Sequence, residues 1–304
     1  MSQIDSKYRY YQPNRPSVTA VQSRRRSLLS VVRLLTTPAI AIFALFGFIH
    51  FVSTVTVADP SSAHTASVPS APSSGNDPAL AKAINGILQQ NGDVQIGVAL
   101  QNIHTGQLQT FGVTSPFVAA STAKVITACN YYHLVETSRA SLASTLGTFN
   151  AAFQIKEMIN NSDNDAWGLL ENDIGDDELA AYASANGINY GVTDNTLTTA
   201  AMATVLTKLY NGQLLNSDDT KQLLSYMQNT NDEDLIPAAV PDDVTVYHKY
   251  GLLDGELHDA AILIQGNQAY SLVIYTKSDD DSDDQARTDT IHQITKAVTS
   301  SIFS

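Results

Sequence analysis

The sequence predicts an α+β fold, an α/β sandwich in which helices flank an antiparallel sheet beside a helical lobe, behind one N-terminal transmembrane helix. Two observations favour this class. From residue 77 onward the apolar patterns run in the order helix, hairpin, helical block, three strands and helix, which is not a βαβ series. Before that point the chain is basic and contains a long apolar stretch, whereas the rest of the chain is acidic.

The N-terminal region predicts a membrane anchor. The first 58 residues carry seven Lys and Arg side chains and one Asp, a formal charge of +6; subtracting this from the whole-chain charge of −13 leaves −19 for residues 59–304. Residues 34–57 are almost free of charge and long enough to cross a bilayer as a helix. Basic residues precede this span and none follows before Lys82, so the positive-inside rule predicts a cytoplasmic tail at 1–33 and an extracytoplasmic remainder.

A cleaved signal peptide is the alternative interpretation of the same region, with the cleavage site at Ala58 and a secreted product. The apolar stretch is longer than a usual signal core and the basic region before it exceeds 30 residues, which favours the uncleaved anchor. Residues 58–76 are rich in Ser, Pro and Ala and predict a flexible linker. The folded domain is therefore expected at 77–304.

The elements of this domain follow from local signals. Thr198 is a good N-cap for the helical pattern after it, and Gly187 is a good C-cap for the pattern before it. Gly266-Asn267 is a turn between two strand-like runs. The expected elements, in order, are a helix at 77–91, a hairpin with strands at 94–103 and 107–112, helices from 121 to about 221 that include 121–136, 176–186 and 199–210, strands at 245–250, 257–265 and 268–277, and a helix at 285–303.

Ser121 and Lys124 carry the first chemical signal. Residues three apart on a helix share one face, so the Lys amine can reach the Ser hydroxyl. A Ser hydroxyl becomes a nucleophile when an adjacent base takes its proton, and a partly desolvated Lys can be that base. The N-terminus of a helix also provides N–H groups and a positive dipole for a developing oxyanion. The pattern S-x-x-K is common, however, and needs further motifs beside it.

Two such motifs follow in order, Ser162-Asp163-Asn164 and Lys249-Tyr250-Gly251. The order S-x-x-K, S-D-N, K-x-G is the signature of class A β-lactamases and penicillin-binding proteins. On these motifs the chain resembles the class A β-lactamase and penicillin-binding serine hydrolase superfamily over about residues 77–304. The segments Thr198–Leu206 and His258–Ile262 also resemble family sequences outside the motifs.

The resemblance implies a role for each motif residue. Ser121 would be the nucleophile with Lys124 as its partner, and Ser162 would link the site to the leaving nitrogen. Asn164 would hold the substrate amide, and Asp163 would be structural. Lys249 is expected on an inner strand facing the site, where its charge binds the substrate carboxylate. The oxyanion hole would be formed by the N–H groups of Ser121 and of Leu252, which follows Gly251.

Two departures from the family pattern concern the substrate and the second half of the reaction. Tyr250 stands where the family has Thr or Ser, so we expect the phenol to restrict the pocket for the substrate carboxylate. Class A enzymes also carry a Glu on the Ω loop that activates the deacylating water. The corresponding segment 189–196 offers only Asp194, whose arm is shorter, so slow deacylation is expected. Glu171 and Glu178 lie in the preceding helical stretch and do not match the family position.

The expected function is that of a membrane-anchored extracytoplasmic serine hydrolase that forms an acyl-enzyme with β-lactams or D-Ala-D-Ala-like cell-wall peptides. One alternative is a D,D-carboxypeptidase or penicillin-binding protein with slow deacylation, and another is an inactive domain that binds peptidoglycan or a partner. We expect a monomer without a cofactor. A metal is not expected either, because the spacing of His248 and His258 matches no zinc motif. The acidic domain excludes a nucleic-acid partner.

Overall fold

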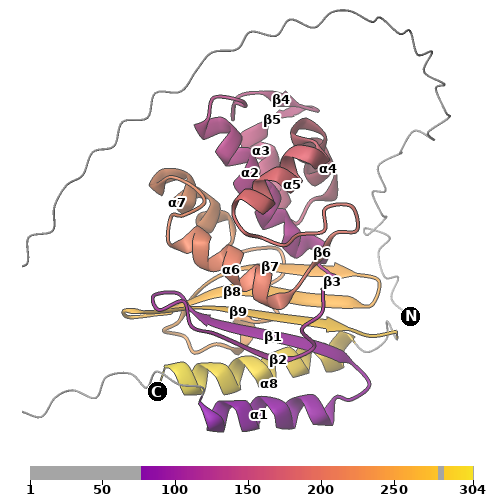
Figure 1. Cartoon of the computed structure of the whole chain (residues 1–304), viewed down its shortest axis with the longest axis vertical. Helices are drawn as coiled ribbons and strands as arrows, with labels where there is room; N and C mark the ends of the chain where they lie inside the picture. The colour runs from indigo at the N-terminus through magenta and orange to yellow at the C-terminus, as the bar shows by residue number, and fades with distance from the viewer. Residues whose placement is uncertain (1–76, 280–283, 304) are drawn as a thin grey trace, which may run out of the picture. The chain divides into compact units, whose positions relative to one another are not determined.

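The computed structural model describes residues 77–279 and 284–303; the predicted tail 1–33, transmembrane span 34–57 and linker 58–76 lie outside these residues. Within the described part, no helix has both the length and the apolar character needed to cross a bilayer. The predicted α+β class is confirmed, with an antiparallel sheet flanked by helices (Figure 1).

One antiparallel sheet organises the domain, in the strand order β2-β1-β9-β8-β7. Its strands are β1 (Gln95–Asn102), β2 (Leu108–Gly112), β7 (Thr245–Leu253), β8 (Glu256–Gln265) and β9 (Gln268–Lys277). The strand β7, which carries Lys249, is therefore an edge strand, and the prediction of an inner strand was wrong. Hydropathy along a strand reports burial of its faces and not which strands pair with it, so the sequence could not distinguish the two positions.

Helices cover both faces of the sheet. The helices α1 (Pro78–Gln90) and α8 (Asp284–Ile302) lie on one face, and α6 (Thr199–Tyr210) lies on the other (Figure 1). Both predicted caps are present. The Thr198 side chain accepts a hydrogen bond from the N–H of Ala201 at the start of α6, and Gly187, with a φ of +67°, follows the end of α5 (Asp176–Ala185).

The helical lobe is built around α2 (Lys124–Glu136), in which ten of thirteen residues are buried. A helix that is buried on all sides must be central, and α2 is indeed packed by its neighbours. Cys129 is one of its buried residues, as expected for a small core side chain. The surrounding helices are α3 (Ala151–Asn160), α4 (Asn164–Ile174), α5 and α7 (Ser217–Tyr226).

Several short elements were not predicted. The strands β3 (Phe117–Val118) and β6 (Thr196–Leu197) pair with each other, as do β4 (Thr145–Leu146) and β5 (Phe149–Asn150). The turns η1 (Ala120–Ala123) and η2 (Pro237–Ala239) are short 3₁₀ helices. Two-residue strands are too short for a periodic pattern, which explains the omission. The β3–β6 pair leads directly into η1 and so positions the candidate nucleophile.

Candidate active site

Ser121 lies in the turn η1, immediately before α2. The turn begins at Ala120, which has a left-handed φ of +47°, a conformation that costs a residue with a Cβ about 1 kcal/mol or more. Its carbonyl oxygen accepts a hydrogen bond of 3.1 Å from Asn195 Nδ2. Thr122 Oγ1 donates to the oxygen of Ala119 at 2.6 Å and lies 2.6 Å from the Tyr275 hydroxyl. These contacts hold a strained turn and leave Ser121 partly exposed among buried neighbours.

Lys124 is fully buried one turn after Ser121. Residues three apart lie on the same side of a 3₁₀ turn, which favours an approach of the Ser121 and Lys124 side chains. The hydrogen bonds of Lys124 Nζ run to Ser162 O at 2.7 Å, to Asn164 Oδ1 at 2.7 Å and to Ser162 Oγ at 3.3 Å. The structure therefore brings the first two sequence motifs together on one amine.

Burial also lowers the pKa of Lys124 to about 7, although the carboxylates of Asp163 and Glu171 act in the opposite direction. A neutral amine has two N–H groups, which match the two short bonds to Ser162 O and Asn164 Oδ1. Its lone pair is then left for a hydroxyl proton. The surroundings of Lys124 are thus those of a general base.

The residues of the S-D-N motif divide between structure and site. Asp163 caps α4, since its Oδ1 accepts a hydrogen bond of 2.7 Å from the N–H of Ala166. Ser162 has a left-handed φ of +54°, which turns its backbone oxygen and its hydroxyl toward Lys124. Asn164, at the start of α4, completes the contact. An ordinary helix cap explains Asp163 but not its two neighbours.

Lys249 is fully buried on β7. Its Nζ donates to the backbone oxygen of Tyr250 at 2.9 Å and lies 3.9 Å from the centre of the Tyr250 ring. Burial, followed by the nearby positive charge of Lys124, holds the pKa of Lys249 well below its usual range. The predicted contact of Lys249 with a substrate carboxylate stays a prediction.

Gly251 allows β7 to pass close to the turn η1, which contains Ser121. A Cβ at this position would lie 3.0 Å from the Ser121 nitrogen and 3.2 Å from the Thr122 nitrogen. A Cβ at these distances would require the backbone of the turn to move by a few tenths of an ångström, so Gly fits here without that displacement. The glycine of K-x-G thus has a steric reason. Leu252 follows with a side chain that is 38% exposed, and the use of its N–H in an oxyanion hole stays a prediction.

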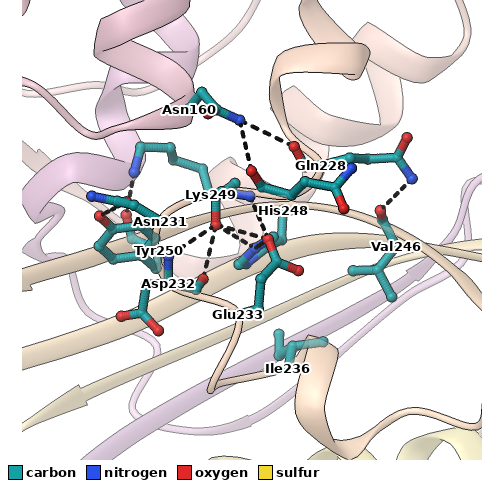
Figure 2. A network of polar contacts seen from close by, with 12 residues as sticks. Asn160, Gln228, Asn231, Asp232, Glu233, Ile236, Val246, His248, Lys249 and Tyr250 are labelled. Carbon is teal, nitrogen blue, oxygen red and sulfur yellow. Dashed lines mark hydrogen bonds and ion pairs between the residues drawn. The ribbon is translucent and has the colours of Figure 1, made fainter.

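Tyr250 does not lie as expected. Its side chain belongs to the buried apolar cluster between the sheet and the helices α1 and α8, and it is only 5% exposed. Its hydroxyl donates a hydrogen bond to Asn231 Oδ1 in the loop after α7 (Figure 2). This placement indicates a structural role for the phenol. Its predicted contact with a substrate carboxylate stays untested.

His258 and Asp259 do not form a triad with Ser121. They point to opposite faces of β8, as the alternation of a strand requires. On one face, Asp259 pairs with His248, with Nδ1 and Oδ1 3.0 Å apart. On the other face, His258 Nε2 lies 2.9 Å from the oxygen of Val118, and burial lowers the pKa of His258 to about 4. His258 therefore supports β3, which leads into the turn η1.

Sequence reasoning set Glu171 aside, yet α4 brings it toward the site. Residues spaced by three, four or seven positions share a helix face, so Asn164, Trp167 and Glu171 lie in one row. The Trp167 ring lies 5.0 Å from Lys124 Nζ. Burial raises the pKa of Glu171 to about 7, and the charge of Lys124 acts in the opposite direction. Asp194, the only carboxylate of the segment 189–196, is exposed.

Comparison with known proteins agrees with this arrangement. Residues 79–302 match the family described as "Beta-lactamase enzyme family". A mutant of PBP-A, solved as its acyl-enzyme complex with penicillin-G, is 23% identical, with a TM-score of 0.66 over 73% of this chain and 95% of its own. The last common ancestor of Gram-negative bacteria (GNCA4) β-lactamase class A is 22% identical, with a TM-score of 0.68 over 73% and 99%. No curated protein matches the chain.

Proposed function

The chain belongs to the beta-lactamase enzyme family, and from this premise we propose that it is a serine hydrolase that forms an acyl-enzyme at Ser121. Its substrates would be β-lactams or D-Ala-D-Ala-like cell-wall peptides. The solved structures with a similar fold support the β-lactam part of this proposal, since one of them is an acyl-enzyme complex with penicillin-G.

The observation that carries the proposal is the environment of the Lys124 amine. The amine is buried, has a pKa near neutrality and lies one turn from Ser121. In the first step, neutral Lys124 takes the proton of the Ser121 hydroxyl as the oxygen attacks the substrate carbonyl carbon. The N–H groups of Ser121 and Leu252 then stabilise the negative oxygen.

Collapse of the tetrahedral intermediate breaks the carbon–nitrogen bond and leaves an ester on Ser121. The leaving nitrogen needs a proton, and the proton held by Lys124 can pass to it through the Ser162 hydroxyl, which lies 3.3 Å from Nζ. Asn164 holds the substrate amide, and Lys249 attracts the substrate carboxylate. Gly251 keeps β7 close enough to Ser121 for Lys249 and Ser121 to act on one substrate.

Hydrolysis of the ester distinguishes a β-lactamase from a D,D-carboxypeptidase or penicillin-binding protein with slow release. A base must activate the water, and general-base help typically contributes 10²–10⁴-fold. Asp194 is exposed and has a shorter arm than the family's Glu, which favours slow release. Lys124 could serve a second time, as in peptidases. We therefore expect penicillins to accumulate as an acyl-enzyme.

The same proposal includes a location. The chain would be a single-pass membrane protein, anchored by residues 34–57, with its N-terminus in the cytoplasm and a monomeric catalytic domain outside the cell. The alternative of a secreted domain differs in one measurable way, because cleavage would produce a mature protein beginning near Asp59. N-terminal sequencing of the protein from intact cells separates the two.

The direct test is the intact mass of the full-length protein after incubation with a fluorescent penicillin. We expect one adduct per chain, located on Ser121 by peptide mapping, and no adduct on Ser121→Ala. Both proteins should have the same circular dichroism spectrum. Labelling that persists in Ser121→Ala would refute the assignment, and an unlabelled wild-type protein would favour the inactive, binding domain.

A second experiment measures release. A chromogenic cephalosporin should give a burst of one equivalent followed by slow turnover, and Asp194→Asn should leave the slow phase unchanged. Fast linear turnover without a burst would mean that a deacylating base is present. Glu171→Gln would then be the first variant to examine, because Glu171 is a partly buried glutamate that interacts electrostatically with Lys124. Loss of turnover with retention of the burst in Glu171→Gln would assign the base to α4.

A further inference from the structure

A segment that the proposed reaction does not use connects the two halves of the site. Residues 227–233, here named the bridging segment, follow α7 and lie between the end of α3 and the edge strand β7 (Figure 2). The end of α3 leads directly into Ser162, and β7 carries Lys249. The bridging segment thus contacts the backbone next to Ser162 on one side and the strand that carries Lys249 on the other.

The first set of contacts fixes the bridging segment to α3. Asn160 Nδ2 donates to the backbone oxygens of Tyr226, Gln228 and Asn229 at 3.1, 3.0 and 3.2 Å. In return, the N–H of Asn231 donates to the oxygen of Asn160 at 3.2 Å. The side chain of Asn231 adds a bond of 3.0 Å from Nδ2 to the oxygen of Asn161. Asn161 is the residue immediately before Ser162, so this contact reaches the site itself.

The second set of contacts fixes the bridging segment to β7. The N–H of His248 donates to the oxygen of Met227 at 2.8 Å, and Gln228 Nε2 donates to the oxygen of Val246 at 3.0 Å. Thr230 Oγ1 lies 3.1 Å from His248 Nε2. An edge strand has backbone groups without a neighbouring strand, and here the bridging segment satisfies part of them. The bridging segment thereby holds the outer edge of β7 in place.

Asn231 joins both sets through one side chain. Its Nδ2 donates to the oxygen of Asn161, just after α3, and its Oδ1 accepts a hydrogen bond from the Tyr250 hydroxyl on β7. A Thr or Ser hydroxyl at position 250 would remain close to the backbone, whereas a phenol extends several ångströms further. The unusual residue of Lys249-Tyr250-Gly251 thus has the length that this contact needs. The Tyr250 ring also supports the Lys249 amine at 3.9 Å.

We propose that Tyr250 and Asn231 are positioning residues that set the distance between Ser162 and Lys249. Where the family has a hydroxyl that binds substrate, this chain would then have a phenol that fixes the width of the site. The inference rests on the proposed function, since it concerns the same site. Catalytic groups displaced by about 1 Å lose up to about 100-fold in rate. A pair that joins the two halves of the site by hydrogen bonds can prevent such a displacement.

The test compares Tyr250→Phe with Tyr132→Phe in the full-length protein. Each variant loses one phenol hydroxyl that donates to a side-chain amide oxygen, since Tyr132 binds Gln222 Oε1 at 2.9 Å in a contact between α2 and α7. We expect the second-order rate of acylation by a penicillin to fall about 10- to 100-fold in Tyr250→Phe and less than about twofold in Tyr132→Phe. Both variants should show a similar decrease in the urea midpoint.

Two further variants sharpen the result. Asn231→Ala should reduce acylation as much as Tyr250→Phe, and the double variant should be no slower than either single one, because both remove the same connection. Tyr250→Thr should also be slow. Faster acylation by Tyr250→Thr would mean that the phenol obstructs a carboxylate pocket and would overturn the proposal, as would equal rates for Tyr250→Phe and the wild-type protein.

Amide hydrogen exchange gives a readout that does not need activity. Tyr250→Phe should increase exchange both in the peptide that covers residues 160–164 and in the peptide that covers residues 248–252. Tyr132→Phe should change exchange in neither peptide. If the wild-type protein is not acylated, the proposed function fails, and the exchange measurement still decides whether the connection exists. Unchanged exchange in both peptides would overturn the proposal even if the enzyme is active.

Discussion

Replacing Glu171 by Gln should move the pH dependence of acylation to lower pH. Burial lowers the pKa of Lys124 to about 7, and the charges of Asp163 and Glu171 limit this decrease. Removal of the Glu171 charge leaves burial less opposed, so the pKa of Lys124 should fall further. Because Lys124 must be neutral to accept the proton of Ser121, a lower pKa extends fast acylation into more acidic conditions.

The size of the effect follows from the fraction of neutral amine. An ordinary lysine with a pKa of 10.5 is only about 0.03% neutral at pH 7, whereas one with a pKa of about 7 is about half neutral. Burial therefore increases the available base by about three orders of magnitude at neutral pH. Below its pKa the neutral fraction falls tenfold per pH unit, so the wild-type rate at pH 5 should be about 50-fold below that at pH 7.

Stopped-flow measurement of single-turnover acylation by a fluorescent penicillin between pH 5 and 9 gives the profile. Glu178→Gln is the matched control, because it removes a carboxylate on the next helix that pairs with Arg139 at the surface. The control should keep the wild-type midpoint. A wild-type rate that does not change between pH 5 and 8, or a midpoint that moves upward in Glu171→Gln, would refute the assignment of Lys124 as the base.

Two other predictions follow from the packing around β7. Gly251→Ala places a Cβ 3.0 Å from the Ser121 nitrogen, so acylation should fall by about 100-fold and stability by about 1–3 kcal/mol. Gly86→Ala, in α1 where a Cβ meets nothing within 4 Å, is the control and should stabilise the protein by about 1 kcal/mol in urea unfolding. For His248, burial alone would lower the pKa, but Asp259 and then Glu233 outweigh it and raise the pKa to about 9. The folded pKa of His248 exceeds the unfolded value near 6.5, so protonated His248 stabilises the folded protein by at most about 3 kcal/mol. This stabilisation is complete below pH 6.5 and is lost as the pH rises through 9. The difference in unfolding free energy between wild type and His248→Gln should therefore shrink from pH 6 to pH 10, and a constant difference would contradict this.

The sequence by itself determined the order and type of the long elements. The helix α6 and the strand β9 begin and end where the pattern predicted, because caps, turns and apolar periodicity are properties of neighbouring residues. The pairing of Ser121 with Lys124 could likewise be recognised from the sequence, because the two residues are only three positions apart. Motif order then predicted a family that the comparison confirms.

Only the tertiary structure decided what surrounds these residues. The pKa of Lys124 depends on burial among segments that are distant in sequence, and the approach of Glu171 depends on how α4 packs beside α2. The edge position of β7 and the bond between Tyr250 and Asn231 likewise arise from non-local contacts. No local pattern encodes them, because desolvation and hydrogen bonding are set by the groups that folding brings into contact and not by the neighbours along the chain.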